Sequence, residues 1–325
     1  MMAAAAKPGQ LVCAGEFYTD LIFSGLQRLP SLGREVKTDD FAISIGGGAA
    51  ITATAAARLG CPTELITVWG ASALDSEARI RLQASGVRCT SAPIRRNEMS
   101  GVSVAVSTRE DRYFLTYPGT SRAVEEHLLG EEALANMGRA RHVHFALTPR
   151  TWDAFRQAVR RLRRGGSTVS WDLGWDPAAG GSRGFRDLCR ELDVVFLNDD
   201  EARRYGGAGS AQDALAHFAR PHSTVVIKRG ASGAIGSRGA GPPIHVEAIR
   251  VEAIETTGAG DAFNGGFLHA WMAGEALEAS LLAGNICGGL STRAAGGVKA
   301  LPTRAEFDGL LGRLKGLGTA GGKGE

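Results

Sequence analysis

The chain has 325 residues, of which 44% are hydrophobic, and its 37 Lys and Arg residues stand against 34 Asp and Glu residues, a formal charge of +3. This balance argues against a nucleic-acid-binding protein, because such proteins usually carry a concentrated basic surface. The sequence contains no run of about 18 apolar residues, so it predicts no membrane-spanning helix. Five scattered cysteines without a CxxC pair predict reduced thiols in a cytoplasmic protein.

Apolar runs alternate with helical patterns along most of the chain. The expected strands cover 11–15, 63–69, 141–145, 167–172, 193–197 and 224–228. The expected helices cover 49–59, 76–84, 151–164, 211–220 and 262–273. Several of the strands are continuous apolar runs, as expected where both faces of a sheet are covered. The pattern predicts an α/β fold with a mostly parallel sheet flanked by helices.

Two segments, 17–45 and 101–117, break this alternation. The second alternates apolar and polar residues around a polar turn at 108–111, which is a hairpin pattern. We expect both segments to form a small antiparallel sheet outside the main domain, as a lid or as an oligomer contact. No Pro-, Gly- or Ser-rich linker separates them from the rest, so we expect one main domain with an insertion.

The strongest chemical signal is the run TTGAGDAF at 256–263, immediately before a helical pattern. Glycines allow close approach of the backbone to a ligand, and the start of a helix offers unpaired N–H groups to an anion such as phosphate. Asp261 stands at this turn, where a carboxylate can accept a hydroxyl proton. The alternative is an ordinary Gly-rich loop with an Asp cap.

The longer string TTGAGDAFNGGF at 256–267 closely resembles the C-terminal signature of the PfkB carbohydrate kinases, also called the ribokinase-like family. The resemblance extends from about Val12 to Pro302. It implies a three-layer ribokinase-like sandwich with a small β-sheet lid. The kinase domain would cover 10–315, with lid segments at about 17–45 and 99–118 and flexible tails at 1–9 and 316–325. By the same resemblance Asp261 is the catalytic base, and the amides of Gly258, Ala259 and Gly260 form the anion hole for the transferring phosphate.

Further motifs fit a site for ATP and Mg²⁺. Asn198 and Glu201 match the family's Asn-x-x-Glu motif, and oxygen ligands at the end of a strand can hold Mg²⁺ through water. Capping of a helix is the alternative for this acidic cluster. Lys228 ends a predicted strand and could reach phosphate; an exposed hairpin Lys is its alternative.

The turn after this strand contains Gly230 and Gly233, which would let ATP lie against the backbone. Asn285 matches the place where relatives bring a side chain near the adenine, and an Asn on a helix surface is the alternative.

On the substrate side, Asp20 matches a strand-end Asp that binds sugar hydroxyls in relatives, since a carboxylate accepts bonds from two hydroxyls; a loop cap is the alternative. The glycines of the N-terminal signature would offer backbone N–H groups, unless they only start a helix: Gly46, Gly47 and Gly48. Ile51 replaces an Asn of ribokinase-type members and Leu147 replaces a Glu, which predicts a less hydroxylated substrate. Asp172 matches another pocket residue, and Trp175 could stack on a sugar or base or only seal a loop.

Other candidate ligands are weaker. Glu255 occupies a position where relatives place a ligand of a monovalent cation, which makes K⁺ a hypothesis. His142 and His144 share a strand face, but zinc would need further ligands.

Taken together, the motifs and the resemblance predict an ATP-dependent sugar kinase that dimerises through the lid. A nucleoside kinase of the same fold is the alternative, and a non-catalytic ligand-binding protein is the third candidate.

Overall fold

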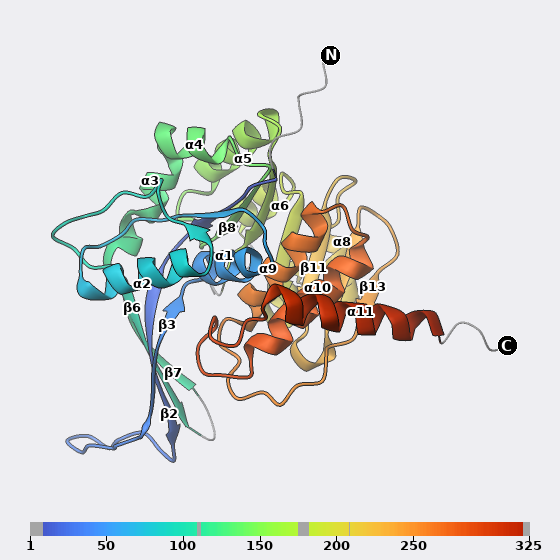
Figure 1. Cartoon of the computed structure of the whole chain (residues 1–325). Coiled ribbons are helices and arrows are strands. Elements are labelled where there is room, and N and C mark those ends of the chain that lie inside the picture. Colours follow the sequence, from blue (N-terminus) through green and yellow to red (C-terminus); the bar gives the residue numbers. More distant parts are fainter. Residues whose placement is uncertain (1–8, 109–111, 175–181, 208, 321–325) are drawn as a thin grey trace.

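In a computed structural model, residues 9–108, 112–174, 182–207 and 209–320 are described (Figure 1). A nine-stranded sheet forms the centre, in the order β13-β12-β11-β10-β9-β8-β1-β4-β5. Its strands are β1 (Leu11–Gly15), β4 (Thr63–Ile66), β5 (Val87–Arg88), β8 (His142–Ala146), β9 (Thr168–Asp172), β10 (Val194–Asn198), β11 (Thr224–Lys228), β12 (Ala234–Arg238) and β13 (Ile244–Val246). The β11–β12 and β12–β13 pairs are antiparallel and the other pairs are parallel.

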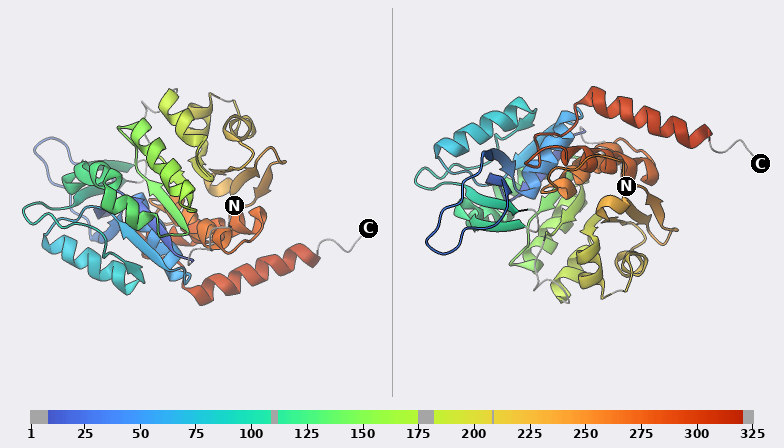
Figure 2. Two further views of the ribbon diagram at one scale, coloured as in Figure 1. Left: turned by 90° about the horizontal axis from the view of Figure 1, so that it is seen from above. Right: turned by 90° about the horizontal axis from the view of Figure 1, so that it is seen from below.

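Helices cover both faces of this sheet (Figure 2). They are α1 (Gly48–Arg58), α2 (Ala73–Ala84), α3 (Val124–Leu129), α4 (Glu131–Met137), α5 (Trp152–Arg164), α6 (Arg183–Cys189), α7 (Asp199–Gly206), α8 (Ala211–Phe218), α9 (Ala259–Met272), α10 (Leu277–Ser291) and α11 (Arg304–Ala320), with the 3₁₀ turns η1 (Gly119–Ala123) and η2 (Gly230–Ser232). One core packs α3 to α8 on one face, and another packs α1, α9 and α10 on the other. The predicted three-layer α/β sandwich is confirmed. Among the described helices, none has the length and apolarity needed to cross a bilayer.

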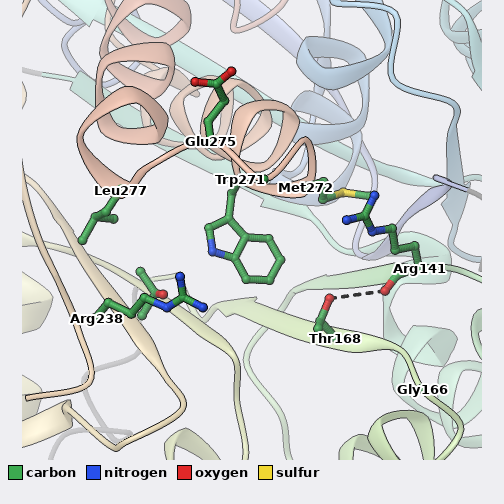
Figure 3. Close-up of a pocket in the computed structure, with 10 residues that line it drawn as sticks. Arg141, Gly166, Thr168, Arg238, Trp271, Met272, Glu275 and Leu277 are labelled. Atoms are coloured by element: carbon green, nitrogen blue, oxygen red, sulfur yellow. Dashed lines mark hydrogen bonds between the residues drawn. The ribbon is translucent and has the colours of Figure 1, made fainter. Parts of the chain in front are cut away.

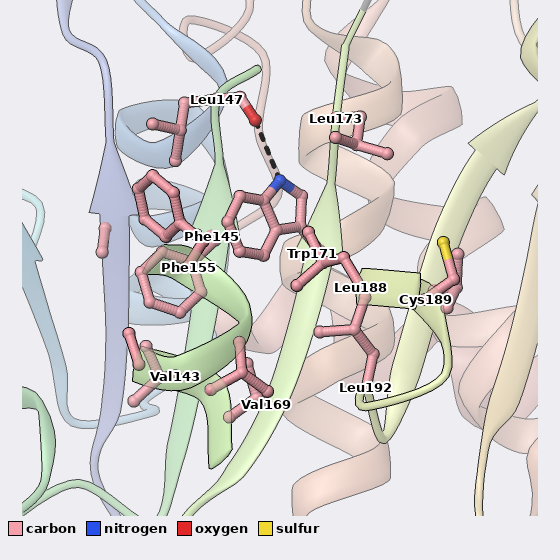
Figure 4. Packing of buried hydrophobic residues seen from close by; sticks show 14 of the residues in the cluster. Val143, Phe145, Leu147, Phe155, Val169, Trp171, Leu173, Leu188, Cys189 and Leu192 are labelled. Atoms are coloured by element: carbon pink, nitrogen blue, oxygen red, sulfur yellow. Dashed lines mark hydrogen bonds between the residues drawn. The ribbon is translucent and has the colours of Figure 1, made fainter. Parts of the chain in front are cut away.

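Aromatic packing locks the middle of the first core (Figure 4). The Trp171 ring stacks on Phe145 with centroids 4.6 Å apart and meets the edge of Phe155 at 5.0 Å. The indole N–H donates to the carbonyl of Leu147 at 2.9 Å. Since adjacent strand residues point to opposite faces, fixing Trp171 also fixes the direction of its neighbour Asp172 on the other face.

A separate four-stranded sheet, here called the small sheet, projects from the main body (Figure 1). It contains β2 (Tyr18–Leu26), β3 (Asp40–Gly46), β6 (Gly101–Thr108) and β7 (Arg112–Tyr117), in the order β3-β2-β6-β7. The two predicted segments do form it together. The prediction of an all-antiparallel sheet is wrong, because β2 and β6 pair in parallel. The hairpin pairs β2–β3 and β6–β7 are antiparallel, whereas β2 and β6 come from distant segments and enter the sheet in the same direction.

Most element boundaries agree with the prediction to within a few residues. β1 and β11 coincide with the expected ranges, while β12 and β13 were not predicted. Helix α9 begins at Ala259 rather than 262. Helix α11 continues to Ala320, so 316–320, expected in a tail, are helical. The domain limits remain predictions, and the expected N-terminal tail (except residue 9), the tip of the hairpin turn (109–111) and Trp175 lie outside the described residues.

Candidate active site

A pocket of about 320 Å³ lies where the small sheet meets the start of α9. Its lining is Tyr18, Asp20, Gly47, Ile51, Ser103, Phe114, Thr116, Thr257, Gly258 and Asp261. Asp20, Gly47, Ile51, Gly258 and Asp261 were singled out in the sequence, and the structure brings them together. The small-sheet residues Tyr18, Ser103, Phe114 and Thr116 were missed. Only the alternation of their strands, which puts every second residue on one face, could have indicated them.

The first turn of α9 presents unpaired backbone donors to this pocket. Gly258 precedes the helix with φ 74°, a left-handed conformation that other residues adopt at a cost. Among the described residues, the N–H groups of Gly258, Gly260 and Asp261 have no acceptor, as is usual for a first helical turn. Ala259 differs, since its N–H donates to the Thr256 carbonyl at 3.2 Å. The turn is a ready anion site, with Ala259 the least available of the three predicted donors.

Asp261 is held beside these donors by α1. The Thr52 hydroxyl donates to the Asp261 carbonyl at 3.0 Å. A Cβ added to Gly48 would lie 2.8 Å from Asp261 Oδ1, so only glycine leaves room for the carboxylate. Burial raises the pKa of Asp261 to about 7; the negative charge of Asp172 adds to this rise, Lys228 opposes it, and Glu201 adds to it again. A carboxyl group with this pKa is poised to exchange a proton near neutral pH.

Behind Asp261, Lys228 and Asp172 form a buried ion pair. The Asn264 amide donates to Asp172 Oδ2 at 2.6 Å, and a Cβ on Gly260 would lie 3.2 Å from Lys228 Nζ. The alternative of an exposed hairpin Lys is therefore wrong, because this side chain is only 12% exposed. Burial lowers the pKa of Lys228, but Asp172, Glu201 and Asp261 outweigh it and the net shift is upward. Asp172, predicted to bind substrate, does not line the pocket and instead anchors Lys228 and Asn264.

Asp20 faces Asp261 across the pocket. Its carboxylate lies against Gly46 and is 8% exposed, and it accepts no hydrogen bond from the described residues. Burial, followed by the charges of Glu255 and Asp261, raises the pKa of Asp20 to about 7. Such a carboxylate has its full hydrogen-bonding capacity left for a ligand.

Ile51 and Glu255 shape the walls around the turn. A Cβ on Gly258 would lie 2.7 Å from Ile51 Cδ1, so Ile51 packs directly on the turn. Glu255 Oε1 accepts the Thr257 N–H at 2.6 Å, and its Oε2 accepts the Gly296 N–H at 3.2 Å. Glu255 thus ties the loop before α9 to the loop after α10.

The predicted nucleotide-binding segment follows β11. Gly230 has φ 55° in η2 and open space where a Cβ would point, whereas Gly233 packs against the Val246 carbonyl. The Asn285 amide donates to the carbonyls of Val246 and Glu247, each at 2.9 Å. With 6% exposure, Asn285 is not a helix-surface residue; it fixes the segment after β13.

Comparison with known proteins decides the family. The chain matches the profile of the pfkB family carbohydrate kinases over residues 9–304. It belongs to the pfkB family of carbohydrate kinases. The predicted enzyme class, a phosphotransferase with an alcohol group as acceptor, is confirmed by this membership and by the similarity to the ribose-1-phosphate kinase described below.

Three similar proteins place this pfkB kinase among its relatives. An ATP-dependent ribose-1-phosphate kinase from Halopiger xanaduensis is 30% identical over 284 residues, 86% of this chain and 90% of that protein. A nucleoside kinase from Methanocaldococcus jannaschii superposes with a TM-score of 0.81 at 20% identity, covering 95% of this chain and all of the other. A structure from E. coli, solved with ATP and Mg²⁺, superposes with a TM-score of 0.79 at 21% identity, covering 94% of this chain and all of the other. The family uses ATP with Mg²⁺.

The Asn-x-x-Glu motif of this pfkB kinase forms a capping box at the start of α7. Asn198 Oδ1 accepts the Glu201 N–H, and Glu201 Oε2 accepts the Asn198 N–H, both at 2.8 Å. The alternative that these residues cap a helix is therefore confirmed. The capping box uses only Oε2 of Glu201, and Oε1 of the same carboxylate has no partner among the described residues. Burial and the charge of Asp172 raise the pKa of Glu201 to about 7. The described residues contain no group of three or more His, Cys, Asp or Glu that could enclose a metal ion.

Proposed function

We propose that this protein transfers the γ-phosphate of ATP to a hydroxyl group of an uncharged sugar or sugar derivative. The observation that carries the proposal is the juxtaposition, in one pocket, of the Asp261 carboxylate, the unpaired amides of the first turn of α9, and Asp20. Phosphoryl transfer depends mainly on positioning and charge stabilisation, and this arrangement supplies both.

In the proposed mechanism, Asp20 and the backbone at Gly47 hold the acceptor so that one hydroxyl points at Asp261. Asp261 accepts the proton as the hydroxyl oxygen bonds to the γ-phosphorus and the bond to the ADP oxygen breaks. The amides of Gly258 and Gly260, with Ala259 after a small adjustment of its N–H, stabilise charge on the transferring group. Lys228 keeps the buried carboxylates partly neutralised. Closure of the small sheet would exclude water as a competing acceptor.

We infer that ATP lies along η2, with Gly230 and Gly233 against the nucleotide and Asn285 supporting the segment beside it. Mg²⁺ would be held through water by Glu201, near Asn198, and it would neutralise phosphate charge. The exposed space at Gly230 and the free Oε1 of Glu201 support these assignments.

The lining of the pocket favours an uncharged acceptor. Among its described residues there is no Lys or Arg, and two carboxyl groups would repel a second phosphate. We therefore propose that ribose is a better acceptor than ribose 1-phosphate, although a ribose-1-phosphate kinase is among the relatives.

A nucleoside acceptor is the second candidate. Phe114 and Tyr18 line the pocket beside Ile51, and aromatic rings of this kind can stack on a base. Measuring ADP release with ribose, fructose, a 2-keto-deoxysugar acid, adenosine and inosine distinguishes the two candidates. If no acceptor supports transfer, the non-catalytic alternative replaces both.

Replacing Asp261 by Asn tests the base. We expect kcat to fall by at least about 10³-fold, while a non-hydrolysable ATP analogue still binds. The matched control is Asp200→Asn, an exposed carboxylate at the start of α7, which we expect to leave kcat within about twofold. An undiminished rate in D261N contradicts the proposal.

We further propose the homodimer predicted from the sequence, formed through the outer face of the small sheet. The large apolar side chains on this face alternate with the pocket-lining ones and are strongly exposed: Phe41 (51%), Ile43 (39%), Tyr113 (46%), Leu115 (77%) and Tyr117 (51%). Exposed apolar patches of this kind are typical of interaction surfaces. Light scattering at micromolar concentration should give a dimer, Leu115→Lys a monomer, and the control Ile94→Lys a dimer. A monomeric wild-type protein contradicts this part.

Two remaining predictions concern K⁺ and location. A K⁺ site beside Glu255 is supported by the position of this carboxylate between the loop before α9 and the loop after α10. Equal rates in K⁺ and tetramethylammonium buffers reject the K⁺ hypothesis. A cytoplasmic location is supported by the five free cysteines.

A further inference from the structure

A second pocket, of about 470 Å³, lies at the amino-terminal ends of strands in the central sheet, away from the candidate active site (Figure 3). Its lining is Arg141, Gly166, Thr168, Thr224, Arg238, Trp271, Met272, Gly274, Glu275 and Leu277. Thr168 and Thr224 are the first residues of β9 and β11, and Trp271 and Met272 are in the last turn of α9. Asp261, by contrast, is in the first turn of α9, about 15 Å away along the helix axis. The pocket therefore cannot be part of the site described above.

The charge of this pocket is positive and uncompensated. The guanidinium groups of Arg141 and Arg238 form no ion pair or hydrogen bond with the described residues. Two other arginines near this end of the sheet are paired, Arg88 with Glu64 at 3.1 Å and Arg163 with Asp193 at 3.2 Å. The one acidic lining residue, Glu275, is itself paired with Lys315 at 3.3 Å. Two free guanidiniums without a carboxylate partner suit an anion, for which arginine is the preferred side chain.

The centre of the pocket is apolar and flat. Figure 3 shows the Trp271 indole between the side chains of Arg238 and Arg141. Met272 and Leu277 pack beside it on the second core, while the indole N–H donates to no described acceptor. A planar ring with a free N–H, flanked by cations, can bind a molecule that has a ring as well as an anionic group.

We propose that this pocket is a second ligand site, for a small organic phosphate such as a sugar or nucleoside monophosphate. The ring of the ligand would lie on Trp271, and its phosphate would contact Arg141 or Arg238. A guanidinium group binds a doubly charged phosphate more strongly than a singly charged carboxylate. The volume lies within the range of about 300–1,000 Å³ that is usual for small-molecule sites.

The experiment uses the full chain labelled with 5-fluorotryptophan and observed by ¹⁹F NMR. The signals of Trp271 and Trp171 are assigned with the variants W271F and W171F. Trp171 is the internal control, because its ring lies in the other core. Adding ribose 5-phosphate should shift the Trp271 signal with a submillimolar Kd. Since the signal reports this pocket locally, the result does not depend on whether the protein transfers phosphate.

Variants then test the contacts. At least one of R141Q and R238Q should weaken this binding at least about tenfold, and R96Q, which removes an exposed arginine from another loop, should not. An unchanged Trp171 signal shows that each variant is folded. The proposal is overturned if Trp271 does not respond up to 10 mM ligand, an upper limit on the order of weak millimolar binding, or if both arginine variants bind as the wild type does. It is also overturned if inorganic phosphate shifts Trp271 as strongly as ribose 5-phosphate, since the ring would then contribute nothing.

Discussion

Two neighbouring groups of buried polar residues lie next to α9, one in contact with Trp271 and the other with Asn264 of that helix, and they differ in charge. The neutral group is a chain of hydrogen bonds along β8 and β9 that joins Thr168, His142, Ser170 and His144, with distances of 2.8, 2.7 and 2.8 Å. The charged group begins two residues further along β9 and contains Asp172, Lys228, Glu201 and Asp261. The first group was visible in the sequence only as two histidines on one strand face.

The comparison of the two groups shows that burial of polar side chains is not by itself evidence of a functional site. Burial lowers the pKa of His142 far below its usual value and that of His144 to about 4, so both rings are neutral and bonded to hydroxyl groups. In the charged group, three carboxyl groups share one ammonium beside unpaired helix amides. Burial, together with the negative charges of Asp172 and Glu201, raises the pKa of Asp261 to about 7, and under the proposed function this prepares the group to accept a proton.

Apart from the loss of the base itself, the largest expected effect follows from removing the only cation of the charged group. Lys228→Met leaves three buried carboxyl groups without compensation, and we expect the free energy of unfolding to fall by roughly 3–5 kcal/mol at pH 8. We also expect kcat to fall at least about 100-fold. Chemical denaturation and steady-state kinetics measure the two effects.

The matched control for this variant is Lys315→Met, which breaks a half-exposed pair with Glu275 and should cost less than about 1 kcal/mol. If K228M is as stable and as active as K315M, the buried pair does not organise the site.

The next effect concerns the backbone of the anion turn. Gly258→Ala places a Cβ at φ 74° and 2.7 Å from Ile51 Cδ1, which should displace the amides and lower kcat by about 10–100-fold. The double variant G258A/I51A removes the contact with Ile51 but leaves the strained φ and a 3.1 Å approach of the new Cβ to Gly297 Cα, so we expect only partial recovery. Full recovery would show that the contact with Ile51, rather than the backbone conformation, limits the rate.

A smaller effect is expected in the neutral group. Ser170→Ala removes the hydroxyl between the two imidazoles and leaves two buried ring nitrogens unsatisfied, at a cost of about 1–3 kcal/mol in stability. We expect kcat to change by less than about twofold. A tenfold loss of kcat would mean that the neutral chain is part of the catalytic machinery, and the contrast between the groups would fail.

The smallest effect is a pH-dependent gain in stability. The pKa of Asp261 is higher in the folded state than in the unfolded chain. The Asp261 carboxyl group therefore contributes fully to stability at pH values below its pKa in the unfolded chain, and this contribution is lost as the pH rises through about 7. Asp261→Asn should therefore gain about 1–3 kcal/mol relative to the wild type between pH 5 and pH 8. Thermal unfolding at both pH values measures this, and an equal difference at pH 5 and pH 8 contradicts the raised pKa.

Much of the fold could be predicted from local patterns. The continuous apolar runs of β1 and β11 and the switch to helical periodicity gave the α/β class, because each depends on neighbours in sequence. The parallel pairing of β2 with β6 could not be predicted, since it depends on segments that are distant in the chain. The strand β12 follows β11 after a short turn, and its five residues include a glycine and two polar residues that weaken the pattern.

The part of the candidate site that lies within a single sequence motif could be predicted. Asp261 and the glycines before it stand together in sequence, whereas Ser103 and Thr116 reach the pocket only through the register of β6 and β7. Asp172 was predicted to bind substrate, and its contacts with Lys228 and Asn264 could not be predicted, because these residues come from β11 and α9. Contacts across elements decide which polar residues face a ligand and which support one.

The most direct test of the account is the pH dependence of kcat, measured for the wild type and for D261N with the best acceptor of the screen. For the wild type we predict that kcat rises with pH through a single ionisation near 7, as the Asp261 carboxyl group loses its proton and becomes a base. The small residual rate of D261N should show no such ionisation. A wild-type kcat that is constant between pH 5 and pH 8, or a D261N variant that keeps the ionisation near 7, would contradict the assignment of Asp261 as the base.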